Sequence, residues 1–309
     1  MRVGKDEAGR VQQVFQLDIY LKERASLVER ALRAVAAEAS GPAARLAEAM
    51  RYSLLGGGKL IRPILALASC EAVGGSPEEA IGFACALEMI HTYSLIHDDL
   101  PCMDDDDLRR GRPTSHKVYG EAIATLAGDG LLTDAFAVLA RSPMARRAPA
   151  LLLETVAELA EAAGSKGMVA GQVIDLVSEG RALKIDELEY LHGRKTGALF
   201  VAAVRGGARM GGASPSEMES LTAYARALGL CFQVVDDLLD VEASAEQIGK
   251  RTQKDRTHGK NTYPKLLGLA RSHQFARELA GRAEAALSAF DQRAEPLRGL
   301  AAFVVERNL

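Results

Sequence analysis

The stretch Leu228-Gly-Leu-Cys-Phe-Gln-Val-Val-Asp-Asp-Leu-Leu-Asp240 does more than any other to decide the fold. Up to its aspartates it is apolar apart from Gln233, so it predicts a buried helix whose last turns carry acids. In a helix, Asp236 and Asp240 lie one turn apart on the same face, with Asp237 on the flank. A solvated helix face would have polar neighbours, and these are missing. We therefore interpret the cluster as a metal site.

A second acidic cluster lies earlier in the chain, in Asp98-Asp99-Leu-Pro-Cys-Met-Asp104, and Arg109-Arg110 follow it. Six residues do not complete two helical turns, so Asp98 and Asp104 would diverge on an ideal helix. Pro101 cannot continue a regular helix, and we expect the loop after it to bring Asp104 back toward Asp98. The spacing does not fit an EF-hand, because the sixth position from Asp104 is Arg109 rather than Gly.

Both clusters have basic residues close by in the sequence. Closely packed carboxylates repel one another until a cation offsets the repulsion, and oxygen-only ligands favour a hard ion such as Mg2+. Such an ion shares phosphate oxygens with its protein ligands, and lysine and arginine neutralise the remaining phosphate charge. The sequence therefore predicts an enzyme that handles a diphosphate through metal.

A third element, Gly56-Gly-Gly-Lys-Leu-Ile-Arg-Pro63, has the chemistry of an anion-binding loop. Its glycines let the backbone approach an anion closely, and Lys59 and Arg62 can neutralise the charge. It is not a Walker A loop, because Leu60 rather than Ser or Thr follows the lysine. A plain turn between helices would explain this segment equally well.

The remainder of the chain predicts a single all-α domain over residues 1–309, with helices around a central apolar cavity. Helical spacing of apolar residues is clear at 27–39, 151–163 and 276–290, and the breaks between such segments fall at Gly and Pro. No convincing alternating strand is present. With 48% hydrophobic and 26% charged residues, the balance is that of a globular protein.

Composition and cysteine usage exclude several classes. A net charge of -3 and the absence of Trp argue against a nucleic-acid partner. The four cysteines form no CxxC pair. The N-terminus lacks the apolar region of a signal peptide, and no stretch reaches the roughly 18 uninterrupted apolar residues of a membrane span. We expect a cytoplasmic protein without a membrane span.

Two histidines allow more than one interpretation. Glu88-x-x-His91 and Glu189-x-x-His192 together match the pattern of a di-iron carboxylate bundle, but that reading leaves the aspartate clusters unexplained. His91 fits either a hydrogen-bonded core residue or a diphosphate contact.

Taken together, these motifs resemble the trans-isoprenyl diphosphate synthases, in particular the bacterial farnesyl diphosphate synthase (geranyltranstransferase) type. The matching motifs are Gly57 to Pro63, Asp98 to Gly111, Lys195-Thr196, Asp236 to Asp240 and Gly259 to Pro264. The likeness runs from about Leu46 to the end of the chain. Residues 1–20 lie outside it, and we expect them to form a peripheral extension.

The resemblance implies an isoprenoid-synthase helical bundle that catalyses a Mg2+-dependent, head-to-tail prenyl transfer. Isopentenyl diphosphate would condense with dimethylallyl or geranyl diphosphate, after ionisation of the allylic diphosphate, to give farnesyl diphosphate. Three Mg2+ ions per active site are implied once diphosphate is bound, with Mn2+ as a substitute. The family is usually homodimeric, which implies a homodimer here.

The resemblance also implies a role for each matching residue. The metal ligands and their supports would be Asp98, Asp99, Asp104, Asp236, Asp237 and Asp240. The allylic diphosphate would be bound by Arg109, Lys195, Lys250 and Lys260. Isopentenyl diphosphate would be bound by Gly58, Lys59, Arg62, His91 and Arg110. The catalytic residues around the carbocation would be Lys195, Thr196 and Gln233.

Product length is implied by the residues before Asp98. Ser94 lies one helical turn below the metal, and Tyr93 lies slightly deeper on the flank. The family uses these two positions as a floor, and Tyr93 beside Ser94 resembles the farnesyl type. A geranylgeranyl product remains the alternative.

Two other classes are disfavoured by the motifs themselves. A class I terpene cyclase would lack the second aspartate cluster and the pocket around Lys59 and Arg62. A non-catalytic partner subunit would be expected to lose aspartates from one cluster, and both clusters are intact.

Overall fold

The computed structural model describes residues 15–36, 38, 40–248 and 261–306, with the backbone alone over 243–248. The longer helices are α1 (Leu17–Val35), α2 (Ala44–Leu54), α3 (Ile61–Ala72), α4 (Pro77–Asp98), α6 (Glu121–Ala140), α8 (Pro149–Ala163), α9 (Met168–Val177), α10 (Ile185–His192), α11 (Ala198–Met210), α12 (Pro215–Ile248), α14 (Leu269–Ala286) and α15 (Glu295–Glu306). Shorter elements are η1 (Gly41–Ala43), β1 (Leu108–Arg109), β2 (Arg112–Pro113), α5 (Ser115–Tyr119), α7 (Met144–Arg147), η2 (Gly193–Gly197), α13 (Tyr263–Leu267) and η3 (Gln292–Ala294). The predicted all-α class is confirmed.

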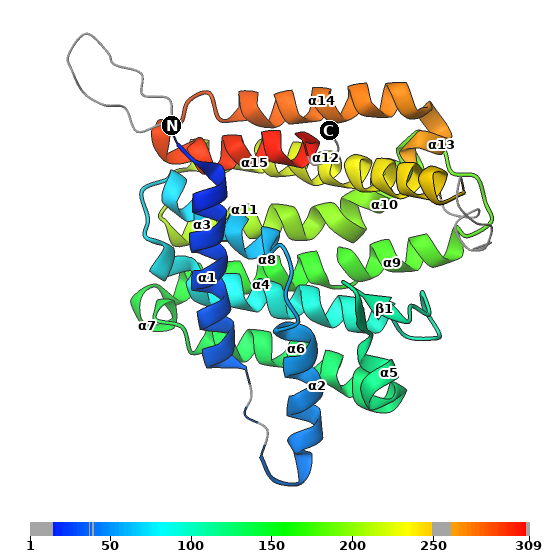
Figure 1. The fold of residues 1–309 in the computed structure, drawn as a ribbon. Helices are drawn as coiled ribbons and strands as arrows, with labels where there is room; N and C mark the ends of the chain where they lie inside the picture. The colour runs from blue at the N-terminus through cyan, green and yellow to red at the C-terminus, as the bar shows by residue number, and fades with distance from the viewer. Residues whose placement is uncertain (1–14, 37, 39, 249–260, 307–309) are drawn as a thin grey trace.

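The helices α3 and α4 form the centre of the bundle. Both are apolar around most of their circumference and buried over most of their length, as expected of helices with neighbours on all sides. The helix α4 packs against α3, α6 and α11, whereas α12 packs against α11, α14 and α15. Figure 1 shows α14, α15 and α12 stacked toward the top of the view, with α1 crossing the front of the bundle. The acids of α4 and α12 are thus carried by two core helices.

Glycines set how closely the central helices approach. A Cβ added at Gly207 of α11 would lie 2.0 Å from the carbonyl oxygen of Ala66 in α3, and one added at Gly206 would lie 2.1 Å from the ring of Phe83 in α4. The backbones of α11 and α3 therefore meet directly, and the Phe83 ring of α4 packs against the α11 backbone, which fixes the position of the segment before α11.

The helix ends follow the expected capping chemistry. The predicted start of α4 at Ser76-Pro77 is confirmed, since Ser76 and Glu79 form a capping box. At α12, Glu217 accepts hydrogen bonds from both the backbone N–H and the hydroxyl of Ser214. Carboxylates in a first helical turn also complement the helix dipole.

Several boundaries differ from the sequence predictions. The helix predicted at 27–39 begins at Leu17, and the one predicted at 276–290 spans Leu269–Ala286. The expected peripheral extension at 1–20 overlaps α1, where Tyr20 is buried and donates its hydroxyl hydrogen to Glu71. Tyr20 and Glu71 are 51 residues apart in the sequence, so local periodicity could not reveal this anchoring contact.

Two short strands were not predicted. They form an antiparallel hairpin in which Arg109 pairs with Arg112. Arg110 and Gly111 connect the strands, and their φ values are +54° and +74°. Two consecutive left-handed residues are typical of a type I′ turn, which matches the twist of a hairpin. Strands of two residues carry no alternating pattern, so they could not be predicted from the sequence.

Among the described residues, one helix, α6, is long and apolar enough to cross a membrane by length and composition. Core helices of soluble proteins pass the same test. Only 33% of its most apolar window is buried, so α6 presents apolar surface outside the bundle. The absence of a membrane span stays a prediction.

Candidate active site

A cavity of about 430 Å3 opens among α3, α4, α9 and η2. One part of its lining is apolar or only weakly polar: Tyr93, Ser94, Leu95, Met103, Met168, Val169, Val173 and Leu176. The other part is charged or polar: Arg62, His91, His97, Asp98, Gln172, Lys195 and Thr196. Such a cavity suits a ligand with an apolar chain and a charged head.

The first acidic cluster turns back on itself as predicted. The helix α4 ends at Asp98, and the backbone N–H of Asp104 donates to the carbonyl oxygen of Asp98 at 2.8 Å. Burial raises the pKa of Asp98 to about 6; Lys195 opposes this rise and Asp104 adds to it. A cation beside Asp98 and Asp104 would favour their charged forms, so the pair fits a metal site.

Asp99 faces away from this cavity, toward a smaller pocket that Arg110 and Arg112 also line. The residue is only 3% exposed, and Arg109 binds its carboxylate through Nε at 2.7 Å and Nη2 at 2.6 Å. Burial raises the pKa of Asp99, with the Arg109 guanidinium opposing the rise. The structure therefore pairs Asp99 with Arg109. Their separate roles, on metal and on phosphate, stay predictions.

Lys195 lies in η2, a single π-helical turn between α10 and α11. Its ammonium donates to Asp175 of α9 at 2.6 Å, and its charge also acts on Asp98. Turns of π-helix are rare and concentrate at functional sites. The cation is thus held at the charged end of the cavity by a carboxylate from a neighbouring helix.

The sequence reasoning missed two residues of α9, Gln172 and Asp175. Gln172 lines the cavity, and neither its side-chain nitrogen nor its oxygen has a hydrogen-bond partner although both atoms are buried. Buried polar atoms without partners are costly, so a ligand at this position would satisfy them. The available signal was the pair of polar side chains three residues apart in the otherwise apolar segment Met168–Val177.

The second acidic cluster divides into exposed and buried members. Asp236 and Asp240 are exposed, whereas Asp237 is only 6% exposed. One oxygen of Asp237 accepts from Gln233 Nε2 at 2.9 Å, and the other accepts from the backbone N–H of Tyr263 at 2.9 Å. Burial raises the pKa of Asp237 to about 7, against the effect of these hydrogen bonds. Asp237 therefore points into the protein, and its predicted metal role stays a prediction.

Thr196 connects the two acidic clusters. It lines the cavity beside Asp98, and its hydroxyl donates to Gln233 Oε1 at 2.9 Å. Gln233 in turn precedes Asp236 and Asp237 by one helical turn. Arg62 also lines the cavity, and the negative charge of Asp236 acts to raise the pKa of its guanidinium. Both clusters thus border one site, and the predicted catalytic residues Lys195, Thr196 and Gln233 lie between them.

The predicted isopentenyl diphosphate residues gather beside α3 and α4. Arg62 Nη1 donates to His91 Nε2 at 3.1 Å, and its guanidinium lies 5.1 Å from the centre of the Phe200 ring. Burial, followed by the charge of Arg62, holds the pKa of His91 well below its usual value, so His91 is a neutral acceptor. Burial also lowers the pKa of Arg62, to about 10.

The glycine loop lies against the hairpin. A Cβ added at Gly58 would lie 2.3 Å from the guanidinium of Arg110, and the φ of Gly58 is +156°. Any larger residue would displace Arg110, so Gly58 is required for this approach. Lys59 is exposed next to it. The structure therefore brings Gly58, Lys59 and Arg110 to one corner of the site.

The predicted chain-length residues lie on the cavity wall. Tyr93 is buried and its ring packs edge-on against His97, with 5.6 Å between ring centres. Ser94 donates its hydroxyl hydrogen to the carbonyl oxygen of His91 at 2.8 Å. Lys250 and Lys260 lie outside the described residues.

Within the described ranges, no three or more His, Cys, Asp or Glu side chains converge as a ready-made metal centre. Glu88 and His91 therefore do not join Glu189 and His192 in a di-iron site. The carboxylates present do fit Mg2+, which accepts one or two protein carboxylates and takes its other ligands from phosphate and water. Asp98 and Asp104 of the first cluster and Asp236 and Asp240 of the second would hold such ions.

The comparisons with known proteins agree with this geometry. The Polyprenyl synthetase family model matches residues 43–294. The chain is 50% identical over 305 residues to a chloroplastic geranylgeranyl pyrophosphate synthase of Capsicum annuum, covering 98% of this chain and 82% of that protein. It is 49% identical to the large subunit 1 of a heterodimeric chloroplastic geranylgeranyl pyrophosphate synthase of Arabidopsis thaliana, covering 95% and 80%.

A solved structure gives the same result at the level of the fold. The apo structure of an FPP/GFPP synthase from Zymomonas mobilis superposes with a TM-score of 0.85 at 39% identity, covering 94% of this chain and 98% of that chain. The chain is therefore a member of the polyprenyl synthetase family, the trans-isoprenyl diphosphate synthases.

Proposed function

We propose that this prenyltransferase is a Mg2+-dependent geranylgeranyl diphosphate synthase, which adds isopentenyl units to an allylic diphosphate. The observation that carries the reaction class is a cavity that has Asp98, Lys195 and Thr196 at its polar end and apolar side chains along the rest. The product is supported by the relatives, which are geranylgeranyl diphosphate synthases at about half identity over nearly the whole chain. The sequence motifs favoured a farnesyl product, whereas the comparisons support the geranylgeranyl alternative better.

A farnesyl product is the second candidate, because one observation favours it. Tyr93 is a buried aromatic residue on the cavity wall, held edge-on against His97. A bulky side chain at this position would limit the space for a growing chain. The two candidates therefore differ in whether the chain passes Tyr93.

The reaction begins when the bond between the allylic C1 and the diphosphate oxygen breaks, and the electron pair leaves with the diphosphate. Mg2+ supplies Lewis-acid stabilisation of the departing diphosphate when bound. Lys195, fixed by Asp175, places a positive charge where the negative charge develops. Thr196 and Gln233 present their dipoles to the carbocation.

Carbon–carbon bond formation follows. The double bond of isopentenyl diphosphate attacks C1, and loss of a C2 proton to the departed diphosphate restores a double bond in the product. Arg62, Lys59 and Arg110 would hold the diphosphate of this second substrate. His91, neutral and hydrogen-bonded to Arg62, keeps the guanidinium in place. The apolar wall excludes water, which would otherwise capture the cation.

We further propose that two copies of the chain associate through α6, α8 and α9. Large apolar side chains outside the active cavity are exposed on all three helices: Leu126 of α6, Leu153 of α8 and Val177 of α9. Exposed apolar surface of this kind marks an interaction site. The homodimer that the sequence resemblance implied would cover it, and sedimentation of the purified chain at several concentrations tests this.

Incubation with Mg2+, isopentenyl diphosphate and, separately, dimethylallyl, geranyl or farnesyl diphosphate tests the main proposal, with mass analysis of the products. Geranylgeranyl diphosphate should accumulate from each primer. Accumulation of farnesyl diphosphate, with no extension of a farnesyl primer, would support the second candidate instead. Asp98→Asn serves as the inactive control, and no elongation of any primer by the unmodified chain would reject both.

A further inference from the structure

A second cavity borders η2 on a face different from the one that lines the active site. Its volume is about 620 Å3, and α8, α10, η2, α11 and α12 contribute to it. Lys195 and Thr196 of η2 line the active cavity, whereas Gly193, Arg194 and Gly197 of the same turn line the second one. One turn of backbone therefore separates the two spaces.

Part of this second cavity is lined by small or apolar residues. They are Ala162, Gly167, Gly193, Gly197, Ala198, Val201, Ala202 and Leu230. A Cβ added at Gly193 would meet nothing within 4 Å, so the space beside η2 is open. This part of the wall suits a short apolar chain.

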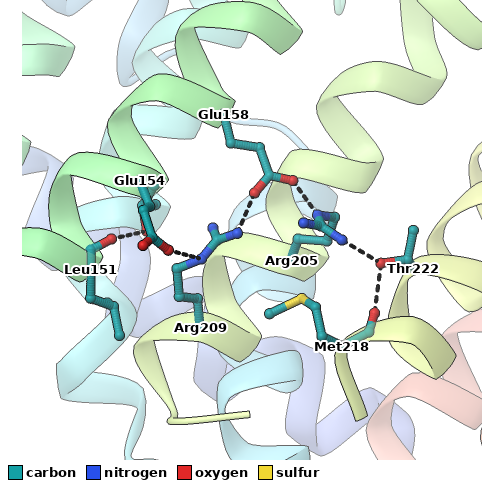
Figure 2. A network of polar contacts seen from close by, with 8 residues as sticks. Leu151, Glu154, Glu158, Arg205, Arg209, Met218 and Thr222 are labelled. Carbon is teal, nitrogen blue, oxygen red and sulfur yellow. Dashed lines mark hydrogen bonds and ion pairs between the residues drawn. The ribbon is translucent and has the colours of Figure 1, made fainter. Parts of the chain in front are cut away.

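The acids of the wall are mostly neutralised by neighbouring bases. Figure 2 shows Glu158 between Arg205 and Arg209, with Arg205 also donating to the hydroxyl of Thr222 at 2.9 Å. Thr222 in turn donates to the carbonyl oxygen of Met218 at 2.6 Å. Elsewhere on the wall, Lys166 lies 3.4 Å from Glu161.

Two arginines of the second cavity have no carboxylate partner among the described residues, namely Arg194 of η2 and Arg226 of α12. Arg194 donates to the carbonyl oxygen of Lys166 at 2.7 Å, and its guanidinium lies 5.0 Å from the centre of the Tyr190 ring. These contacts hold the guanidinium in place and leave other N–H groups for a ligand. Arg226 is exposed at the same cavity.

The charge balance indicates what kind of anion fits. The lining contains Lys166, Arg194, Arg205 and Arg226 against Glu158, Glu161 and Glu189, a formal balance of one positive charge. Glu189 would repel a highly charged diphosphate, while one or two guanidinium groups suit a carboxylate or a phosphate monoester.

We propose that this second cavity binds an amphipathic anion of low charge, a carboxylate or phosphate monoester on a short apolar chain, as an effector of the enzyme. The head would bind Arg194 and Arg226, and the chain would lie along the Ala198–Ala202 side of the cavity. Binding requires no metal, which distinguishes this site from the active cavity.

Ligand binding in the second cavity affects catalysis through η2. Arg194 immediately precedes Lys195 and Thr196, whose contacts with Asp175 and Gln233 position the charged end of the active cavity. A ligand that engages Arg194 and favours one arrangement of the turn changes those contacts. This step alone rests on the proposed function, because it uses the catalytic roles of Lys195 and Thr196.

Calorimetric titration of decanoate into the full chain, without Mg2+ or substrates, tests the binding itself. One site per chain is expected, with at least tenfold weaker binding in Arg194→Gln and in Arg226→Gln. Arg277→Gln, an exposed arginine of α14 outside this cavity, is the matched control and should bind as the unmodified chain does. Decyl phosphate should also bind, whereas decanol and inorganic phosphate should bind at least tenfold more weakly.

Unchanged decanoate binding in both arginine variants would overturn the site, as would equal binding of decanol. The effector role is tested by prenyl transfer at saturating decanoate, where kcat should change at least threefold in the unmodified chain and not in Arg194→Gln. A site that fills without changing turnover would overturn the coupling. Absence of all prenyl transfer would reject the proposed function and leave the calorimetric result standing.

Discussion

The carboxylate of Asp237 accepts the backbone N–H of Tyr263 at 2.9 Å, across 26 residues of sequence. This bond ties the acidic end of α12 to the start of α13. Two residues before Tyr263, Asn261 accepts from the backbone N–H of Leu183 at 3.0 Å and donates to the carbonyl oxygen of Arg181 at 2.9 Å. The Asp-Asp pair of α12 therefore contains one exposed carboxylate, Asp236, and one that organises the surrounding backbone.

Asn substitutions at these two positions should have different consequences. Asp236→Asn removes an exposed carboxylate from the predicted metal site, so we expect it to raise the Mg2+ concentration required for half-maximal activity about tenfold or more. Asp237→Asn weakens buried hydrogen bonds, so we expect a loss of about 1–3 kcal/mol in unfolding free energy. It should also lower kcat with little change in the Mg2+ requirement. Activity as a function of Mg2+, together with urea unfolding, separates the two effects. A shared rise in the Mg2+ requirement would make Asp237 a metal ligand.

The raised pKa of Asp98 predicts a dependence of stability on pH. Burial raises this pKa from 3.8 to about 6, so between these values the folded chain holds a proton that the unfolded chain has released. The contribution is therefore fully present below pH 4 and is lost as the pH rises through about 6. Asp98→Asn avoids this loss. Without metal, we expect the unfolding free energy of the variant, relative to that of the unmodified chain, to rise by about 1–2 kcal/mol between pH 4 and pH 7.5. Urea unfolding at both pH values measures the gain, and a difference that does not vary with pH would contradict it. Mg2+ with inorganic pyrophosphate should stabilise the unmodified chain more than the variant.

The ion pair between Asp175 and Lys195 predicts that Asp175 influences catalysis through Lys195. Asp175→Asn leaves the lysine charged and loosely placed, so we expect kcat/KM for the allylic diphosphate to fall about tenfold, or about 1.4 kcal/mol. The KM for isopentenyl diphosphate should change little. In a Lys195→Gln background the same substitution should have almost no further effect, because the pair acts as a unit. Additive losses in the double variant would show that Asp175 acts independently of Lys195.

Much of this site could be predicted from short-range sequence rules. The acids of α12 follow from helical spacing in an apolar stretch, and the return of Asp104 to Asp98 follows from the inability of Pro101 to continue a helix. Both are local effects of backbone geometry, which a single sequence contains. The all-α class follows for the same reason, from helical periodicity interrupted at Gly and Pro.

Contacts between distant segments could not be predicted in this way. Nothing near Asp237 shows that its partner is the backbone of Tyr263, and nothing near Asp99 shows that the side chain of Arg109 binds it. Asp175 was overlooked because its partner, Lys195, lies 20 residues away on a different element. In each case the orientation of a carboxylate is set by tertiary packing, which helical periodicity does not contain.

Tyr93 provides the decisive test of product length. Its ring lies on the cavity wall against His97, so Tyr93→Ala should open space beneath the polar end and shift the products toward chains at least one isoprene unit longer. Tyr93→Phe retains the ring and loses only the hydroxyl, so it is the matched control and should leave the product profile unchanged. Truncating a buried aromatic residue costs about 3–5 kcal/mol of stability, so the melting temperature of each variant should be measured alongside. Product analysis with geranyl and farnesyl primers then gives the answer. Longer products in Tyr93→Ala alone would make this ring the floor of the cavity, whereas the same profile from a folded Tyr93→Ala variant would place the limit elsewhere on the wall.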